Sequence, residues 1–286
     1  MEYCFVILHY LTLQDTIECV DSIRNKMCNK DYSIVIVDNF SNNGSLEKLQ
    51  LLYENNSIIH IVTSEINLGF AQGNNLGYRY ARNKLKARNI IVLNNDIILN
   101  TDNVFDIIEY EVSNYNTYII GPDIVSLVDD GHQNPLYGNV LTKSKAIALI
   151  IKYRIICILI KMHLYNLVLP KNKKFQINIS DKECNRIENC KLHGAFLIFT
   201  HKFVENEQNA FHPGTFLYLE EEILYRYCIA KSYKMVYNPD VSVFHKEDSS
   251  TNSLLSVPMK KKLFVLENNI KSLKVYLSIL RENKNA

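Results

Sequence analysis

Three clusters of carboxylate, amide and glycine residues in the first hundred positions have the composition of a nucleotide-binding site. The first comprises Asp38, Asn39 and Ser41 and follows the apolar run SIVIV. Side chains of these types at a strand end can bond the edge of a base or a ribose hydroxyl. An ordinary polar turn is the alternative, and the motif alone does not exclude it.

The second cluster, NLGFAQGNN at 67–75, places glycines and amides at the start of a predicted helix. Glycine lets the backbone approach a ligand closely, and a helix N-terminus favours phosphate. Asn67, Gly69, Phe70 and Asn74 are therefore candidates for donor binding, and a glycine-containing helix entry is the alternative. Neither GxGxxG nor GxxxxGK[ST] spacing occurs, so neither a dinucleotide site nor a P-loop is predicted.

The third cluster is Asn94-Asn95-Asp96, directly after the apolar run NIIVL. Hard cations such as Mg²⁺ take oxygen ligands from one or two carboxylates and complete their coordination with phosphates. Asp96 is thus a candidate metal ligand, although an isolated Asp in a turn more often forms a cap.

Two further candidates lie in the second half of the chain. Glu220 and Glu221 begin a predicted helix, where a carboxylate beside a reacting hydroxyl can act as a general base. Acidic residues that complement the helix N-terminus are the alternative. His245 closes the short run VSVFH; a lone histidine is usually structural, but a strand-end position near phosphate chemistry favours a role in the site.

The elements that must position these residues alternate between strand and helix. Short apolar runs at 3–9, 33–37, 58–62 and 89–93 are separated by helical patterns. Their length and β-branched content favour strands, and the alternation predicts parallel βαβ units with right-handed crossovers. Ligands of such sheets bind beyond the carboxyl ends of the strands, which is where the polar clusters fall.

The second half contains a different kind of segment. We expect a strand at 194–200, a helix at 220–231, strands at 234–238 and 241–245, and a C-terminal amphipathic helix at 259–280. Residues 143–169 are rich in Ile and Leu, but Lys152, Arg154 and Lys161 interrupt any run long enough to span a membrane. This basic helix fits either a membrane interface or a buried core with snorkelling lysines.

Composition excludes several classes of protein. The 286 residues are 47% hydrophobic and 22% charged, which is typical of a globular chain. A net charge of +2 gives no reason to expect a nucleic-acid partner. The 7 cysteines include no CxxC pair, so reduced thiols in a cytoplasm are expected rather than disulfides or a zinc site.

Taken in order, these motifs resemble family 2 glycosyltransferases, the inverting GT-A-fold enzymes that include rhamnosyltransferase-like proteins. The resemblance covers 1–100 well and 190–246 reasonably, while 125–190 has no counterpart. The matching segments are VDNFSNNGS at 37–45, NLGFAQGNNLGYRYA at 67–81, VLNNDIIL at 92–99, GAFLIF at 194–199, FLYLEEEIL at 216–224 and VFH at 243–245.

The resemblance implies an α/β fold: a GT-A-type, Rossmann-like, mostly parallel sheet flanked by helices. The chain would be a single glycosyltransferase domain with a nucleotide-sugar-binding half at 1–124 and an acceptor and catalytic half at 191–257. An inserted Ile-rich basic segment at 125–190 and a C-terminal helix at 258–286 would complete it.

The resemblance also implies roles for individual residues. Asp38 would contact the base, with Asn67, Gly69 and Asn74 beside the base and ribose. Asp96, the last residue of an Asp-x-Asp-like element, would bind Mn²⁺ or Mg²⁺ and through it the donor diphosphate. Asn94 replaces the first carboxylate of that element.

On the acceptor side, Gly194 and Ala195 would shape the pocket and His245 would lie near the metal or diphosphate. Glu221 stands where the family usually has the Asp of a Glu-Asp pair, its general base. The longer side chain leaves open whether Glu220 or Glu221 serves. The family's second Asp is also missing, because Ile223 occupies its position.

The implied function is transfer from a UDP- or dTDP-sugar to a hydroxyl of a glycan or lipid-linked acceptor. This would occur in bacterial cell-surface polysaccharide synthesis, such as capsule or O-antigen, in the cytoplasm with peripheral contact to the inner membrane. The alternatives are an inactive nucleotide-binding scaffold and a sugar-phosphate nucleotidyltransferase. The latter would need a Gly-rich basic loop after the first strand, where this chain has HYLTLQDT.

Overall fold

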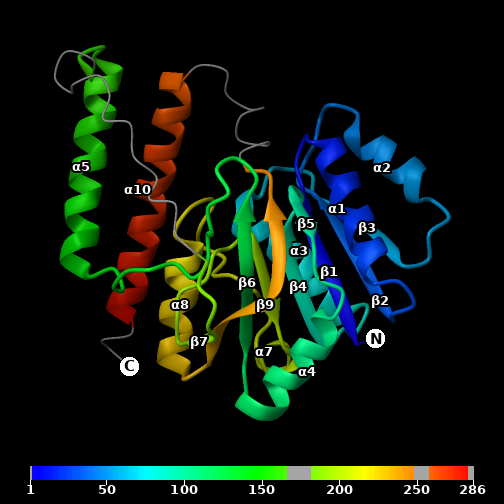
Figure 1. Ribbon diagram of the computed structural model, residues 1–286. Helices are drawn as coiled ribbons and strands as arrows, with labels where there is room; N and C mark the ends of the chain where they lie inside the picture. Colours follow the sequence, from blue (N-terminus) through cyan, green and yellow to red (C-terminus); the bar gives the residue numbers. More distant parts are fainter. Residues whose placement is uncertain (1, 166–181, 248–257, 283–286) are drawn as a thin grey trace.

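The computed structural model describes residues 2–165, 182–247 and 258–282 (Figure 1). Within them, nine strands form one sheet. The strands are β1 (Tyr3–His9), β2 (Tyr32–Asp38), β3 (Ile59–Thr63), β4 (Asn89–Asn94), β5 (Ile97–Leu99), β6 (Ile119–Ser126), β7 (Ile187–Glu188), β8 (Phe196–Phe199) and β9 (Met235–His245). The helices are α1 (Leu13–Lys26), α2 (Ser45–Tyr53), α3 (Gly69–Asn83), α4 (Val104–Tyr115), α5 (Lys143–Lys161), α7 (His201–Asn206), α8 (Glu220–Lys231) and α10 (Pro258–Glu282).

The strand order is β3-β2-β1-β4-β8-β6-β9-β5, with β7 paired to β9. Strands β3, β2, β1 and β4 are parallel to one another, as are β6 and β9. β8 lies between β4 and β6 and runs antiparallel to both, and β5 and β7 are antiparallel to β9. The expected α/β sheet flanked by helices is confirmed, but parallel pairing dominates only its first half.

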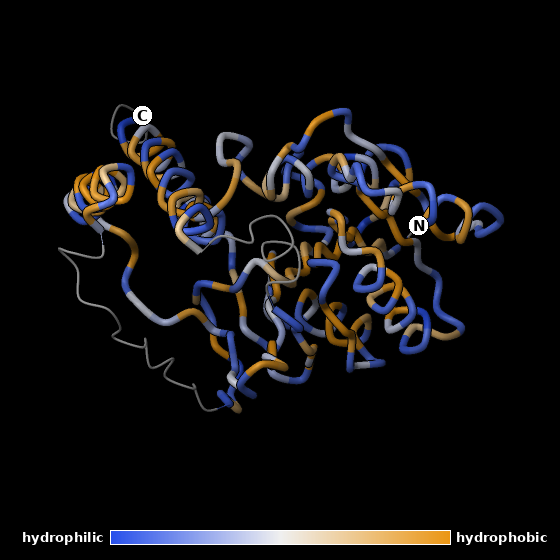
Figure 2. The backbone as a smooth tube through the Cα atoms, turned by 90° about the horizontal axis from the view of Figure 1, so that it is seen from above, coloured by the Kyte–Doolittle hydropathy of each residue, from blue (hydrophilic) through white to orange (hydrophobic). Residues whose placement is uncertain are grey.

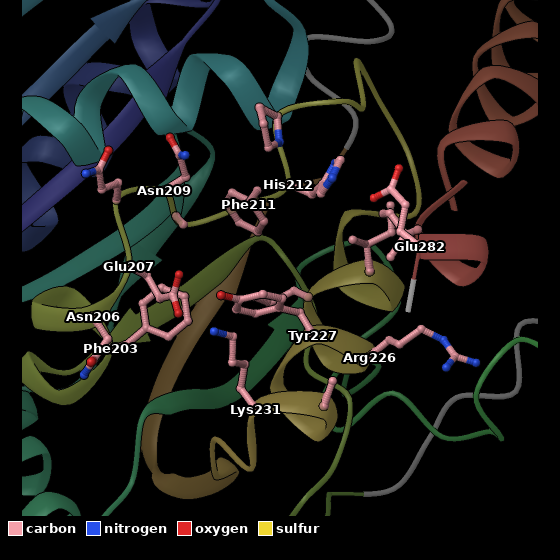
Figure 3. Close-up of a pocket in the computed structure, with 17 residues that line it drawn as sticks. Phe203, Asn206, Glu207, Asn209, Phe211, His212, Arg226, Tyr227, Lys231 and Glu282 are labelled. Carbon is pink, nitrogen blue, oxygen red and sulfur yellow. The ribbon is translucent and has the colours of Figure 1, made fainter. Parts of the chain in front are cut away.

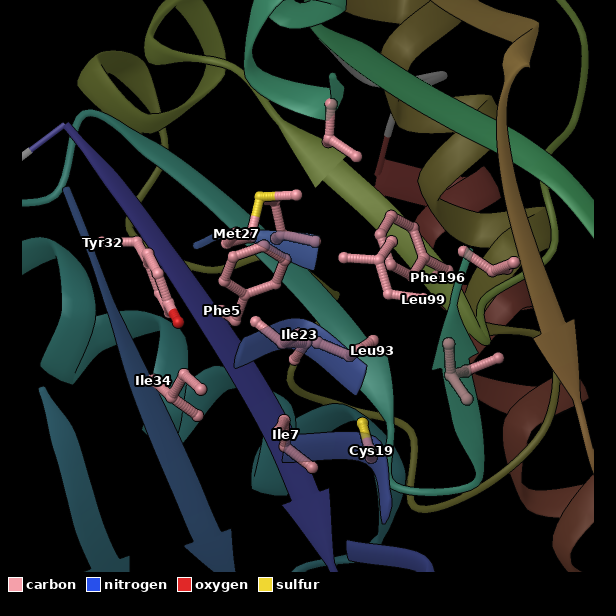
Figure 4. Close-up of a cluster of buried hydrophobic side chains, with 14 of the residues drawn as sticks. Phe5, Ile7, Cys19, Ile23, Met27, Tyr32, Ile34, Leu93, Leu99 and Phe196 are labelled. Atoms are coloured by element: carbon pink, nitrogen blue, oxygen red, sulfur yellow. The ribbon is translucent and has the colours of Figure 1, made fainter. Parts of the chain in front are cut away.

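Two hydrophobic layers cover the faces of the sheet because neighbouring residues of a strand point to opposite sides. Phe5 and Ile34 face α1, α2 and α4, where Ile23 of α1 packs against them (Figure 4). Val6 and Val35 face α3, α7 and α8 on the other side. Both faces of the parallel strands are therefore buried, which explains why their sequences are continuous apolar runs.

Several predicted boundaries move in the structure. The two strands expected at 234–238 and 241–245 are one strand, β9, whose register shifts opposite Pro122 and Asp123 of β6. The polar break at Pro239-Asp240 thus marks an irregularity within a strand rather than a loop. Helix α3 begins at Gly69 instead of 73, and α8 spans 220–231 as expected.

The predicted insertion does not begin outside the sheet, because β6 continues to Ser126 and Val125 bridges to His132. Its helical part, α5, ends at Lys161, and residues 166–169 of the predicted segment lie outside the described residues. α5 packs along α10, and the two helices form an arm beside α8, away from the sheet (Figure 1). Among the described helices, none combines the length and apolarity that crossing a membrane requires.

Candidate active site

The predicted donor residues converge at the carboxyl ends of β1, β2 and β4. Register pairs His9 with Asp38 and Leu8 with Asn94, so these strand ends lie side by side. The Asp38 side chain is buried, and its Oδ2 accepts a hydrogen bond from the Ser41 amide at 3.1 Å. Its Oδ1 is buried without a hydrogen-bond partner. A buried carboxylate oxygen in this state is costly and marks a place where a ligand donor fits.

A buried histidine lies beneath Asp38. His9 Nδ1 is 2.7 Å from Thr16 Oγ1 and its Nε2 is 2.8 Å from Ser45 Oγ. Burial lowers the pKa of His9 to about 4, against the smaller opposing influence of Asp38, whose Oδ1 lies 3.8 Å from Nε2. His9 is therefore neutral near pH 7 and does not offset the Asp38 charge.

Asn39 connects β2 to the loop before α3. Its Oδ1 accepts from the Leu68 amide at 2.8 Å, and its Nδ2 donates to Asn67 Oδ1 and to the Gly69 carbonyl, both at 3.2 Å. Asn67 Oδ1 also accepts from the Gly69 amide at 2.9 Å. These bonds use both the oxygen and the nitrogen of the Asn39 side-chain amide. Asn39 therefore holds the loop at 67–69, which carries the predicted nucleotide-binding residues and is called the donor loop below.

The glycine at the start of α3 is required by its surroundings. Gly69 has φ +74°, and a Cβ there would lie 2.2 Å from the Phe216 carbonyl oxygen. The Phe70 amide donates to that same oxygen at 2.7 Å, and the Phe70 ring packs on Phe211. This contact joins the donor loop to the segment before α8. One turn further, the buried Asn74 Nδ2 donates to the Phe70 carbonyl, while its Oδ1 has no hydrogen-bond partner.

Asn94, the last residue of β4, and the two residues that follow it make different contacts. The Asn94 amide donates to the Ala195 carbonyl at 2.9 Å, which fixes the strand end against the segment before β8. Asn95 is buried and its Nδ2 donates to Thr12 Oγ1 at 2.7 Å and Thr16 Oγ1 at 2.9 Å, so it stabilises the start of α1. Asp96 is the member of the three that faces β9.

Asp96 and His245 form a pair. Because Ile97 of β5 pairs with His245 of β9, the preceding Asp96 lies beside the imidazole, with 3.3 Å between Asp96 Oδ1 and His245 Nε2. The other ring nitrogen, Nδ1, is 2.8 Å from Gln133 Oε1. An amide oxygen at Nδ1 favours the tautomer with its proton there, leaving the Nε2 lone pair toward the carboxylate. A divalent cation is a group that both side chains can bind.

This pair fits a divalent ion that is completed by a substrate. Among the described residues, no group of three or more His, Cys, Asp and Glu side chains is placed to hold a metal. One carboxylate and one imidazole are nonetheless a suitable protein contribution for Mn²⁺ or Mg²⁺ when phosphate oxygens and water supply the remaining ligands. The donor set is therefore compatible with a metal that binds together with a diphosphate.

His193 lies at the centre of the predicted acceptor side, which comprises Gly194, Ala195 and Glu221. Its amide donates to Asn134 Oδ1 at 2.7 Å, and its ring lies 5.9 Å from the His245 ring. Burial lowers the pKa of His193, with Glu221 as the largest opposing influence and Asp96 a smaller one in the same sense. The imidazole thus lies within electrostatic reach of both the candidate base and the candidate metal ligand.

Glu221 reaches this centre from the first turn of α8. Its Oε1 accepts from the Gly194 amide at 3.2 Å, and a Cβ at Gly194 would lie 2.9 Å from that oxygen. Ala195 is buried next to it. Tyr218 and Leu219 directly before the helix both have positive φ, 73° and 71°. Non-glycine residues held in this conformation are common where a backbone must aim a functional side chain.

Glu220 has a different environment from its neighbour. It is buried, and its Oε1 has no hydrogen-bond partner. Burial, followed by the charge of Glu221, raises the pKa of Glu220 from 4.5 to about 7. Glu222 is bound within the protein, by Lys191 Nζ at 2.9 Å and the Leu141 amide at 2.6 Å. Of the three glutamates, Glu221 is the one that faces Gly194 and His193.

Residues 4–165 match the family model described as glycosyl transferase family 2, which covers more than half of the chain. The chain belongs to this family. The match ends before α8, so the roles of Glu220 and Glu221 rest on the geometry above and not on the family model. None of the curated proteins is similar enough in sequence to match this chain.

Solved glycosyltransferase structures share the fold. TarS residues 1–349 from S. aureus, solved with UDP-GlcNAc, has a TM-score of 0.53 at 12% identity, covering 87% of this chain and 59% of that one. GalNAc-T7 with UDP, GalNAc and Mn²⁺ has a TM-score of 0.56 at 15% identity, covering 87% and 45%. This chain therefore spans well under two thirds of either protein. Identities this low establish a shared GT-A-type fold alone.

Sequence reasoning missed two residues of this glycosyltransferase site, Gln133 and His193. Gln133 lies in the stretch without recognisable motifs and reaches the site because its amide donates to the Ile124 carbonyl of β6 at 2.8 Å. Its Nε2 also donates to Glu247 Oε1 at 2.5 Å. His193 directly precedes the GAFLIF motif, and a polar residue at the start of a buried strand was the available signal.

A pocket of about 510 Å³ lies on the other side of α8, between the segment 203–213 and the end of α10 (Figure 3). Phe203, Phe211 and Tyr227 form its apolar wall and Lys231 lies at its edge. None of the predicted site residues lines it. The chemistry-bearing groups are instead at the carboxyl edge of the sheet.

Proposed function

We propose that this chain transfers a sugar from a nucleoside-diphosphate sugar to an acceptor hydroxyl with inversion at the anomeric carbon. The observation that carries the proposal is the convergence of the Asp96–His245 pair and Glu221 around His193. A metal-binding pair and a candidate base around one centre are the parts that such a displacement needs. The UDP-GlcNAc of the TarS structure and the UDP and Mn²⁺ of the GalNAc-T7 structure support this choice of donor and ion.

Recognition of the nucleoside is assigned to the strand ends. Asp38 Oδ1 and Asn74 Oδ1 are buried acceptors without partners, and a base N–H or a ribose hydroxyl supplies the missing donor. Asn39 and Asn67 hold the loop that carries Gly69 beside this place. A pyrimidine with an imide N–H, as in UDP- or dTDP-sugars, matches an acceptor-only Asp38.

Asp96 and His245 would hold Mn²⁺ or Mg²⁺, which when bound would stabilise negative charge on the departing diphosphate. Gln133 orients the imidazole by accepting at Nδ1, as outer partners of metal-bound histidines generally do. Asn95 secures the turn that delivers Asp96 by bonding to the start of α1.

The displacement uses Glu221 as the base. The acceptor oxygen forms a bond to the anomeric carbon while the bond from that carbon to the diphosphate oxygen breaks, and the nucleoside diphosphate leaves with the electron pair. Glu221 takes the acceptor hydroxyl proton, and the Gly194 amide holds its carboxylate in place. A positioned base typically contributes about 10²–10⁴-fold. Glu220 is the weaker candidate because Glu221, and not Glu220, faces Gly194 and His193.

The acceptor in this proposal is a growing glycan, free or lipid-linked, in bacterial cell-surface polysaccharide synthesis on the cytoplasmic face of the inner membrane. The resemblance of the motifs to rhamnosyltransferase-like enzymes supports hexosyl or deoxyhexosyl transfer. Structures that are less than 25% identical to this chain do not identify its acceptor, so the choice of acceptor depends on the sequence motifs alone.

The test is calorimetric binding of a panel of nucleoside diphosphates and sugar nucleotides, each with and without Mn²⁺. We expect metal-dependent binding of one nucleotide, lost in Asp96→Ala and kept in Asp102→Ala, an exposed carboxylate just past β5. Transfer activity should fall about 10³-fold or more in Asp96→Ala, since a metal ion contributes several kcal/mol. Binding to none of the panel would contradict the proposal, whereas nucleotide binding without transfer would favour the inactive nucleotide-binding scaffold.

A further inference from the structure

The outer face of α5 carries a stripe of exposed apolar side chains. Its members are spaced by four, four, three and four residues, and each is between 41% and 59% exposed. At 100° per residue they fall within an arc of about 80° on one side of the helix. The stripe consists of four residues of α5 and the C-cap residue directly after it: Ile147, Ile151, Ile155, Ile158 and Met162.

Basic residues flank this stripe on both sides. At the same helical angles, Lys143, Arg154 and Lys161 lie along one flank, and Lys145 and Lys152 lie along the other. All five are exposed, and α5 contains no acidic residue. Lys161 also pairs with Glu267 of α10 at 2.8 Å, and the others extend from the helix beside the apolar stripe.

The opposite face of α5 is already used for folding. Ala146, Ile150, Cys157 and Ile160 are buried against α10 in a cluster that includes Leu273. Figure 2 shows the arm from above, with α5 as a largely hydrophobic tube at the outer margin and α10 between it and the sheet. The described residues therefore leave about half of each side chain in the stripe uncovered, and exposed apolar patches of this kind usually have a partner.

We propose that the α5 stripe is a membrane-docking surface that lies in the interface of an anionic bilayer. The isoleucines would insert at the boundary of headgroups and acyl chains, while the basic residues on both flanks meet negatively charged headgroups. Charge complementarity favours lipid over a second copy of this chain, because two copies of α5 would bring like charges together. The helix rests on the surface rather than crossing it, in agreement with the interrupting basic residues.

The arm is connected rigidly to the candidate base. Glu222 of α8 accepts from the Leu141 amide just before α5, and Ser272 of α10 donates to the Leu217 carbonyl before α8 at 2.9 Å. Ile223 of α8 belongs to the arm's hydrophobic cluster. Docking through α5 would therefore hold Glu221 at a set orientation to the membrane. This consequence for a lipid-linked acceptor rests on the proposed function, whereas the docking surface does not.

The experiment is flotation of the full chain with vesicles of phosphatidylcholine alone and of phosphatidylcholine mixed with phosphatidylglycerol. We expect the protein to float with the anionic vesicles and much less with the neutral ones. Ile151→Glu combined with Ile155→Glu should abolish flotation. Lys152→Gln combined with Arg154→Gln should reduce partitioning about 30-fold, since each basic residue near an anionic surface contributes a factor of about five.

The matched control is Leu51→Glu combined with Leu52→Glu, two exposed leucines of α2 far from the arm, which should float like the original protein. Nucleotide binding measured without vesicles checks that each variant is folded and tests the proposed function separately. Flotation that is absent, or equal for all variants, overturns the docking surface. Concentration-dependent dimerisation without flotation, lost in the double glutamate variant, would instead assign the stripe to a second copy and overturn the proposal.

Discussion

The carboxyl edge of the sheet and the outer face of α5 depart from the usual distribution of residues in opposite directions. At the sheet edge, Asp38, Asn74 and Glu220 are at most 4% exposed, and each has an oxygen without a hydrogen-bond partner. On α5, Ile151 and Ile158 are each 55% exposed. Buried polar groups and exposed apolar patches are the two informative exceptions to ordinary burial.

The comparison teaches that each region lacks a partner of a particular chemistry. Buried oxygens without donors disfavour the folded chain until a ligand supplies hydrogen bonds or charge. Transfer of exposed isoleucine side chains from water to an apolar surface lowers the free energy. The sheet edge is therefore suited to binding a polar ligand, and the exposed face of α5 is suited to binding an apolar surface. Substitutions should accordingly affect transfer at the edge and attachment at the arm.

The largest effect is expected at the candidate base. Glu221→Gln should lower kcat by about 10²–10⁴-fold, because the amide cannot take the acceptor proton. Nucleotide binding should be largely unchanged, since Glu221 faces Gly194 and not the strand ends. Steady-state transfer and calorimetry on the same preparation separate the two. Glu220→Gln is the comparison variant, and a larger loss there than in Glu221→Gln would move the base to Glu220.

The burial of Glu220 should be visible in the pH dependence of stability. Its pKa is raised from 4.5 to about 7 by burial and then by Glu221, so the folded state holds the proton more tightly than the unfolded state. The resulting stabilisation is fully present below pH 4.5 and is lost as the pH rises through 7. Glu220→Gln should remove about 3 kcal/mol of pH dependence over this range.

Urea unfolding at pH 5 and pH 7.5 measures this difference. Glu47→Gln, an exposed glutamate in the first turn of α2, is the control and should keep the original pH dependence. An unchanged profile in Glu220→Gln would mean that the carboxyl is solvated, and the sheet edge would lose one of its buried groups from the comparison.

On the arm, adjacent residues should behave in opposite ways. Ile150 is buried against α10 while Ile151 belongs to the exposed stripe. Ile150→Ala should reduce the free energy of unfolding by about 2–4 kcal/mol through lost burial and a cavity. Ile151→Ala should change it by less than about 0.5 kcal/mol. Equal losses in chemical denaturation would show that the stripe is covered within the chain.

The smallest effect is expected at Gly194, whose amide holds the carboxylate of the candidate base Glu221. In Gly194→Ala the new Cβ would lie 2.9 Å from Glu221 Oε1, and the flexible carboxylate would move away. We expect kcat to fall about tenfold with nucleotide binding unchanged, because small displacements of catalytic groups are costly. Added to Glu221→Gln, the substitution should have almost no further effect on kcat. Simple additivity of the two losses would show that Gly194 acts independently of Glu221.

Local patterns were sufficient for much of the donor side. The apolar runs predicted β1 to β4, and parallel strands necessarily bring their carboxyl ends to one edge, which places Asp38 and Asn94 near each other. The bounds of α8 were also predicted, since a helix depends on side chains a few residues apart. Periodicity is a property of neighbouring residues and can be read without knowing the fold.

Long-range pairing was beyond such patterns. Insertion of β8 between β4 and β6 brings Ala195 to Asn94, and pairing of β5 with β9 brings His245 to Asp96. The resemblance predicted that Asp96 and His245 act together, but no local pattern placed Gln133 beside them. Gln133 reaches this place because the chain after β6 turns back and bonds to Ile124 of β6. Its contact with His245 of β9 joins residues more than a hundred positions apart in the sequence.

For the arm, the sequence by itself determined a basic, Ile-rich helix too often interrupted by charge to span a membrane. It favoured an interfacial helix only slightly over a buried one. Only the tertiary structure decided which residues are covered. α10 packs against one face of α5 and leaves Ile151 and its companions exposed. Apolar residues lie on more than one side of α5, so the sequence of this helix gives no single preferred face, and its burial is set by the helix that packs against it.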